Sequence, residues 1–171
     1  MVLDGLRPDD APCLVACYDA AVAWAWFDAR PMTLERAHRD VANSAAKWRR
    51  GSLFRRFAIR RQGSPDLAGT LQLHPKPAEG SVLDIWLCPT SRGQGVGKRA
   101  ARLALAYGFD EMAVAWVEVE VRPENVASRA LAIAVGFEPI EGQWRQLHHK
   151  GPFIEPYRLT VERWRALEAG A

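Results

Sequence analysis

The chain has 171 residues, of which 49% are hydrophobic and 25% are charged, which is the size and composition of one globular domain. Its net charge of +3 is too small to indicate a nucleic-acid-binding protein by itself. No stretch approaches the roughly 18 apolar residues of a membrane-spanning helix, and the acidic N-terminus MVLDGLRPDD lacks the apolar run of a signal peptide, so we expect one cytoplasmic domain over residues 1–171.

The N-terminal part predicts one strand and two helices. A short strand near 2–6 precedes a helix over 9–22, whose start is marked by the prolines and aspartates of RPDDAP. The aromatic stretch AWAWFDARP at 23–31 ends at a proline, and a second helix runs over 33–50. Thr33 is the expected N-cap of this second helix, and Gly51 is its expected stop.

Strands dominate the middle of the chain, and the rest mixes strands with helices. The turn sequence GSPD between two strands predicts a hairpin. The expected elements, in order, are strands at 53–61, 67–74 and 82–88, a helix at 94–109, a strand at 114–121, a helix from Asn125 to 135 closed by Gly136, and strands near 137–141 and 155–161. Because strands and helices mix without strict alternation, we expect an α+β domain on a mixed α/β sheet.

The three cysteines, Cys13, Cys17 and Cys88, are expected to be buried, reduced thiols. An odd number in a domain of this size is not typical of a disulfide framework. Cys13 and Cys17 would share a helix face, but two thiols with no histidine nearby are too few ligands for structural zinc. We therefore expect no metal.

The most informative segment is LDIWLCPTSRGQGVGKR at 83–99, where a strand leads into a glycine-rich turn and then an amphipathic helix. The glycines of RGQGVG, at 92–97, remove Cβ atoms where a ligand must come close. The start of the helix offers unpaired N–H groups and the positive end of its dipole, and Arg92, Lys98 and Arg99 add positive charge. This combination predicts an anion site suited to a pyrophosphate.

Two other phosphate-binding motifs fit less well. The Walker A pattern GxxxxGK[ST] fails because arginines stand where it needs its first glycine and its serine or threonine. A dinucleotide-binding fingerprint is a closer rival, since Gly95, Gly97 and Ala100 match GxGxxA and Glu120 lies where a ribose-binding acid belongs. Only about 50 residues follow Glu120, however, which is fewer than a parallel dinucleotide-binding sheet needs.

A second motif, VEVEVRPENVASRALAIAVGF at 117–137, makes the chain resemble the GCN5-related N-acetyltransferases (GNAT). The first motif is similar to the pyrophosphate motif of that superfamily, an Arg or Gln, two residues and Gly-x-Gly, here Arg92, Gly95 and Gly97. The second is similar to its Asn-x-x-Ser … Gly-Phe segment. The resemblance is strong over 83–137 and closest to the branch that acetylates the N-termini of ribosomal proteins, which also holds many small-molecule acetylators.

The resemblance implies one N-acetyltransferase domain whose mostly antiparallel sheet, flanked by helices, contains two splayed parallel strands, 82–88 and 114–121. Acetyl-CoA would lie in the gap, with its pantetheine arm paired to exposed backbone and an amide near Leu87 stabilising the oxyanion. The expected cofactor-binding residues are Ile85, Trp86, Leu87, Arg92, Gly93, Gln94, Gly95, Val96, Gly97, Lys98 and Asn125.

The resemblance also implies direct attack of a primary amine on the thioester. Glu120 matches the general-base glutamate of some members, and together with Glu118 it would attract a cationic amine. These two acids also fit the solvated face of a strand. Many members carry a tyrosine seven residues after the asparagine as general acid, but Ala132 stands there, so we assign the acid to Ser128, directly or through water.

The acceptor is either a protein or peptide N-terminus or a small-molecule amine. An α-amino group loses its proton more easily than a lysine, since typical pKa values are about 8 and about 10.4. Trp26 and Asp84 are the expected substrate-binding residues. A homodimer is compatible with the resemblance, because dimers are common in this family.

Two alternatives stay open. The absent tyrosine at Ala132 is compatible with a non-catalytic acyl-CoA-binding sensor or interaction module, and the glycine motif with a dinucleotide-binding protein. The run at 47–61 holds seven basic residues and no acid, which would suit an acidic partner such as RNA. Such a run is also typical of a solvated helix end and strand edge, and we expect no nucleic-acid partner.

Overall fold

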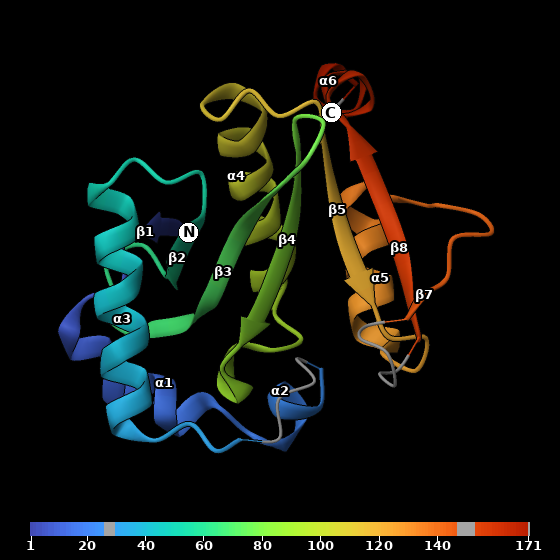
Figure 1. The fold of residues 1–171 in the computed structure, drawn as a ribbon. Helices are drawn as coiled ribbons and strands as arrows, with labels where there is room; N and C mark the ends of the chain where they lie inside the picture. The colour runs from blue at the N-terminus through green and yellow to red at the C-terminus, as the bar shows by residue number, and fades with distance from the viewer. Residues whose placement is uncertain (26–29, 147–152, 171) are drawn as a thin grey trace.

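The computed structural model describes residues 1–25, 30–146 and 153–170. Its centre is an eight-stranded sheet in the order β1-β2-β3-β4-β5-β8-β6, with β7 paired to β8 off this path (Figure 1). The strands are β1 (Val2–Asp4), β2 (Arg55–Arg60), β3 (Leu67–Lys76), β4 (Gly80–Leu87), β5 (Trp116–Val121), β6 (Glu138–Pro139), β7 (Arg145–Gln146) and β8 (Phe153–Thr160). The helices are α1 (Ala11–Cys17), α2 (Ala20–Ala25), α3 (Leu34–Arg49), α4 (Val96–Asp110), α5 (Val126–Val135) and α6 (Val161–Ala169), with short 3-10 turns at Pro8–Asp10 and Pro89–Ser91.

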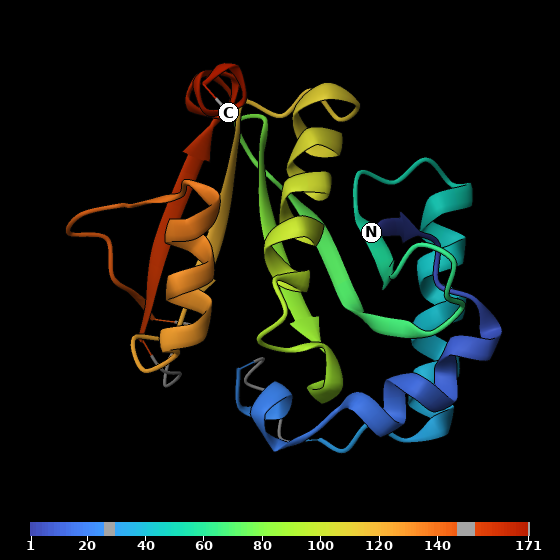
Figure 2. The ribbon, with the colours of Figure 1, turned by 180° about the vertical axis from the view of Figure 1, so that it is seen from behind.

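The sheet is mostly antiparallel, as expected, and among the described strands only β4 and β5 run parallel. One apolar core packs α4 and α5 against one face, which Figure 2 shows from that side. A second core packs α1 and α3 against the other face, around Trp86 and Cys88. No helix of the described part is long and apolar enough to cross a membrane.

The parallel strands separate soon after they meet. Their pairing joins Gly80 to Trp116 and ends at Val82 and Glu118, so the rest of β4 has no partner on that side among the described strands (Figure 1). Gly80 allows the close start of this pairing, because a Cβ there would lie 2.1 Å from the Trp116 ring. The splayed pair that the resemblance implied is confirmed.

The N-terminal helix differs from the expectation, because residues 9–22 form two helices. Tyr18 leaves helical geometry with ψ at 81°, which ends α1. Asp19 then starts α2 by accepting a hydrogen bond from the Val22 N–H at 2.9 Å. A local cap therefore overrides the continuous apolar spacing of the sequence.

A C-terminal helix, α6, was not predicted. Its start is a standard cap, since the Thr160 hydroxyl accepts from the Arg163 N–H at 3.3 Å and Glu162 lies in the first turn. The signal was therefore present in the sequence. The caps that were predicted do form: Thr33 accepts from the Arg36 N–H at 3.1 Å.

The expectation of three reduced thiols is wrong, because Cys17 and Cys88 form a disulfide across a sequence separation of 71. Cys17 ends α1 and Cys88 follows β4, and the fold brings these two ends together. Cys13 is a free thiol whose Sγ lies 3.7 Å from the Sγ of Cys17, on the shared helix face that was expected. The disulfide ties α1 to the segment that leads into the glycine-rich turn.

Three of the seven basic residues of the run at 47–61 are at least partly buried, whereas Lys47, Arg49, Arg50 and Arg61 are exposed. Arg60 is buried and pairs with Asp10 at 2.7 Å. Arg56 donates to the Gln72 side chain at 2.8 Å. These contacts give part of the run a structural role, and the expectation of no nucleic-acid partner stays a prediction.

Candidate active site

A cavity of about 240 Å³ opens where β4 and β5 diverge. Five residues that sequence analysis assigned to the site line it, namely Asp84, Ile85, Glu120, Asn125 and Ser128. Trp86, Leu87 and the turn at 92–98 are not among its lining residues. Trp26 lies outside the described residues.

The backbone of β4 presents alternate residues to this cavity. The Cys88 N–H donates to the Ala68 carbonyl of the neighbouring antiparallel segment at 2.9 Å. Because hydrogen-bonding directions alternate along an antiparallel strand, the N–H and C=O of Leu87 and Ile85 point the other way, towards β5. The backbone N–H and C=O of Trp86 point to β3. Trp86 therefore cannot pair through its backbone with a ligand between β4 and β5, which differs from the expectation. Its ring packs edge-on against Tyr18.

The glycine-rich turn places the start of α4 beyond the end of β4. Gly93 and Gly95 have φ angles of 69° and 70°, a region that glycine adopts without strain, and Gly95 occupies the N-cap position. A Cβ on Gly97 would lie 3.3 Å from Leu131 of α5, so this glycine lets the two helices approach. The first N–H groups of α4 have no partner within the helix, which is the feature that an anion site needs, and the site itself stays a prediction.

Two polar side chains of the turn contact the protein rather than open space. The Arg92 guanidinium pairs with both carboxylate oxygens of Asp19, at 2.8 and 3.0 Å, and donates to the Leu87 carbonyl at 3.1 Å. The hydrogen bonds from Arg92 lower the pKa of Asp19. Gln94 donates to the Thr90 carbonyl at 2.6 Å. These two side chains shape the turn, which leaves its backbone as the main group that can face an anion.

Asn125 joins β5 to α5 at the cavity. Its side-chain oxygen accepts from the Ser128 N–H at 3.1 Å, so it caps α5, and Gly136 closes the helix with a φ of 111°. Ser128 and Ala132 both line the cavity, and Ala132 is buried at the position where a family tyrosine would stand.

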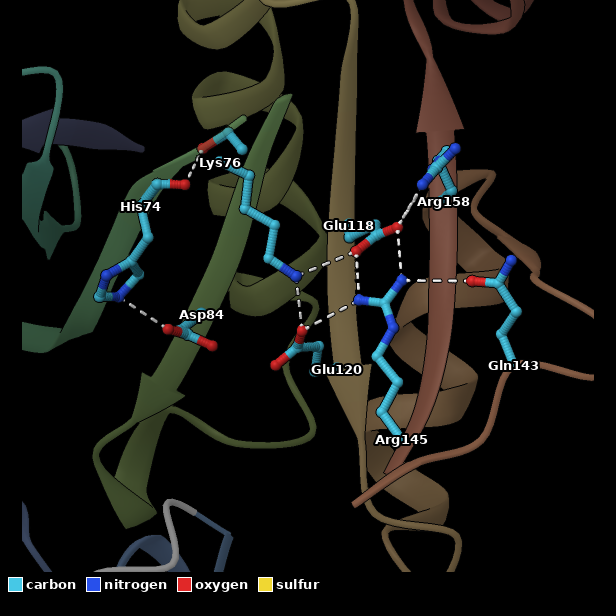
Figure 3. A network of polar contacts seen from close by, with 9 residues as sticks. His74, Lys76, Asp84, Glu118, Glu120, Gln143, Arg145 and Arg158 are labelled. Carbon is cyan, nitrogen blue, oxygen red and sulfur yellow. Dashed lines mark hydrogen bonds and ion pairs between the residues drawn. The ribbon is translucent and has the colours of Figure 1, made fainter. Parts of the chain in front are cut away.

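The face of the sheet beside the cavity carries a network of acids and cations (Figure 3). At its centre Glu118 is fully buried, with 0% exposure. Its carboxylate accepts from Lys76 at 3.2 Å, Arg145 at 2.9 Å and Arg158 at 2.7 Å. Burial alone would raise the pKa of Glu118, but these hydrogen bonds outweigh it and lower the pKa to about 2.

This shift predicts a specific loss of stability in acid. The ordinary pKa of the group is 4.5, so its contribution is fully present above that pH and is lost as the pH falls towards 2. The full shift corresponds to about 3 kcal/mol of unfolding free energy. Urea unfolding of the wild type and of Glu118→Gln at several pH values checks this, because only the wild type should lose this increment between pH 4.5 and 2.

Glu120 lies two residues after Glu118 on the same face of β5, and it lines the cavity. Lys76 contacts its Oε1 at 2.7 Å and Arg145 contacts the same oxygen at 3.4 Å. Both cations also contact Glu118, so they connect the buried acid with the acid that lines the cavity (Figure 3). Glu120 is therefore held by one oxygen, and its carboxylate keeps a fixed position on the cavity wall.

A second carboxylate comes from the opposite strand. Asp84 of β4 lines the cavity, and its Oδ2 lies 2.9 Å from Nε2 of His74 and 3.2 Å from the Gln72 amide nitrogen. Sequence analysis gave His74 no role, because a lone histidine near a strand end carries no signal of its own. The antiparallel register, which pairs Gln72 with Asp84 and His74 with Val82, brings these side chains together.

Comparisons with known proteins identify relatives of this arrangement. A family model described as an acetyltransferase (GNAT) domain matches residues 1–138. The FsC-acetyl coenzyme A-N(2)-transacetylase of Aspergillus fumigatus is 34% identical over 80 residues, which is 44% of this chain and 34% of that protein. The match therefore spans about a third of the length of this curated relative.

Solved structures share the whole fold at low identity. A RimL ribosomal L7/L12 alpha-N-protein acetyltransferase in complex with coenzyme A has a TM-score of 0.76 at 16% identity, covering 94% of both chains. A spermidine N-acetyltransferase from Vibrio cholerae, in complex with CoA and spermine, has a TM-score of 0.77 at 16% identity, covering 96% of this chain and 97% of that one. At such identities the likeness establishes the fold.

Proposed function

The chain belongs to the GNAT acetyltransferase family, and on that premise we propose that it is an N-acetyltransferase that moves the acetyl group of acetyl-CoA to a primary amine. The observation that carries the proposal is the early end of β4–β5 pairing beside the outward-facing amide of Leu87. The cavity, the open edge of β4 and the start of α4 follow one another in this order along the chain direction of β4. This is the order in which an acyl group, a pantetheine arm and a diphosphate follow one another in acetyl-CoA.

The cofactor would be held mostly by backbone. The diphosphate would accept hydrogen bonds from the turn and the first N–H groups of α4, with Lys98 and Arg99 exposed nearby to add attraction. The pantetheine amides would pair with the open edge of β4, where the Leu87 carbonyl already accepts one hydrogen bond from Arg92. Asn125 would contact the arm through its side-chain NH2 group, because its side-chain oxygen caps α5.

The reaction would proceed by direct attack. The amine nitrogen bonds to the thioester carbon, the oxyanion forms near the Leu87 N–H, and the carbon–sulfur bond then breaks to release CoA thiolate. Ser128 lines the cavity and would pass the second proton of the amine nitrogen, which is lost as the carbon–sulfur bond breaks, to the thiolate, directly or through water. A thiol has a pKa near 8.5, so this step needs little help from an acid.

The acceptor would be a cationic primary amine, because two carboxylates, Asp84 and Glu120, face the cavity. Glu120, the general base that the sequence favoured, is held through Oε1, which leaves its second oxygen to bind the ammonium group. Both a protein N-terminus and a polyamine-like small molecule fit this chemistry. Of the relatives named above, one is described as an alpha-N-protein acetyltransferase and another as a spermidine N-acetyltransferase.

Glu120→Gln tests the proposal. We expect kcat/KM for acetylation of an amine panel to fall at least tenfold, because the charge that attracts the ammonium group is removed, while CoA affinity by calorimetry stays within about twofold. Glu124→Gln is the matched control, since Glu124 is exposed and lies outside the cavity lining. CoA binding without turnover on any amine would support the sensor alternative, and a chain indifferent to millimolar CoA would end the proposal.

A further inference from the structure

The wall of the cavity opposite Glu120 carries an acid that is coupled to a histidine. Asp84 reaches the cavity, and His74 reaches Asp84 from behind, with Nε2 at 2.9 Å from Oδ2 (Figure 3). This nitrogen is buried and has no well-aligned hydrogen bond among the described residues. The His74 side chain is nevertheless 39% exposed, so the ring connects a buried nitrogen with solvent.

Acetyl transfer needs a group that removes a proton from the amine and then loses it. Histidine is the side chain whose charge ordinarily changes between pH 5 and 8, which suits uptake and release of a proton in one turnover. Glu120 is already engaged by Lys76 and Arg145. Asp84 has no such cation within ion-pair distance among the described side chains, and its ionisable neighbour there is His74.

We propose that Asp84 and His74 form one proton-accepting unit that carries the proton of the acceptor amine from the cavity to solvent. This rests on the proposed function, since it assigns a step of the same reaction. Asp84 is the member that faces the amine. His74 is a positioning residue that acts through Asp84.

The step balances as follows. An Asp84 oxygen takes a proton from the ammonium group, directly or through water, and the freed lone pair forms the new C–N bond. The proton then passes to Nε2 of His74, in the tautomer that carries its own proton on Nδ1, so that an imidazolium forms beside the restored carboxylate. The imidazolium releases its Nδ1 proton to solvent, which leaves the remaining proton on Nε2. Between turnovers Nδ1 takes up a proton from solvent while the Nε2 proton passes back through Asp84 to water in the empty cavity, so the starting tautomer is restored with no net change in protons.

The surroundings of the unit hold it in place and set its charge balance. The Gln72 amide donates to Oδ2 of Asp84, and Arg56 in turn donates to the Gln72 carbonyl oxygen at 2.8 Å. The His74 ring packs edge-on against Phe54, with centroids 4.8 Å apart. The charged groups on the elements around the unit are Arg56 of β2, Lys76 of β3, Asp40 and Lys47 of α3, and Glu118 and Glu120 of β5.

The test is the pH profile of kcat/KM for one fixed amine acceptor. The wild type should show an ionisation between pH 5 and 8, and His74→Gln should lower kcat/KM about 100-fold at pH 7 and remove that ionisation. Asp84→Asn should give a similar loss. In His74→Ala, added imidazole should restore at least a tenfold part of the rate, because the exposed side of the ring leaves a path for it.

Several results separate this inference from the proposed function. CoA affinity should be unchanged in all three variants, and His38→Gln, a change of an exposed histidine on α3, should leave rate and profile unaltered. Retention of the rate and the ionisation in His74→Gln would overturn the proton unit and leave the acetyltransferase proposal intact. Loss of that ionisation in Glu120→Gln, with the ionisation kept in His74→Gln, would also overturn the proton unit alone. A wild type that acetylates no amine would overturn both the proton unit and the acetyltransferase proposal.

Discussion

Gly95→Asp should lower the affinity for CoA about 100-fold or more, with a loss of stability from the left-handed backbone at Gly95 that its asparagine control shares. Gly95 is the N-cap of α4, and an aspartate there would accept hydrogen bonds from the same N–H groups that we assign to the diphosphate. Its negative charge would also repel the ligand, and a 100-fold change corresponds to about 2.7 kcal/mol. Isothermal titration with CoA measures the affinity.

Gly95→Asn is the matched control for this change. Asparagine has the same shape as aspartate, tolerates the left-handed backbone about equally well and caps helices similarly, but it adds no charge. A new Cβ would lie 3.2 Å from the flexible end of Arg99, and both variants share that contact. We therefore expect a clearly smaller loss with asparagine. Wild-type CoA affinity in Gly95→Asp would show that the diphosphate binds elsewhere.

Glu118→Ala should destabilise the protein by about 3–5 kcal/mol, the usual cost of leaving a buried ion pair without one partner. Glu118 is fully buried and is contacted by Lys76, Arg145 and Arg158. Without it, three cations gather beside the sheet with only Glu120 to balance them. Chemical denaturation at neutral pH measures the loss of unfolding free energy.

Glu120→Gln serves as the control for this second change. Glu120 belongs to the same network, but its side chain is 23% exposed and water can take over part of its role. It should cost about 1 kcal/mol or less. Equal losses in the two variants would mean that the network is solvated as a whole and that burial of Glu118 does not set the energy.

The fold was predictable where local chemistry and pattern agree. The turn at 92–97, the cap at Asn125 and the helix end at Gly136 could be predicted because glycine and asparagine at such positions are typical of turns and helix ends. The break at Tyr18 was missed because Asp19 looked like one polar residue in a helical pattern. Its partner, Arg92, lies 73 residues away, and such a contact leaves no trace in local spacing.

The site was predictable as a position on two strands but not as a set of contacts. Glu118 and Glu120 were identified as two acids on one face of a strand. The cations that distinguish them come from β3, β7 and β8, so the sequence could not show that one acid is buried and the other faces the cavity. The Cys17–Cys88 disulfide was hidden for the same reason.

The early parting of β4 and β5 also restricts which molecules can enter. An open strand edge ordinarily recruits another polypeptide, and proteins protect such edges on their outer surface. Here the edge opens in the interior of the sheet, between two strands that stay paired at one end. A slim arm with amide groups could complete the ladder, so the gap would admit a pantetheine as its ninth member.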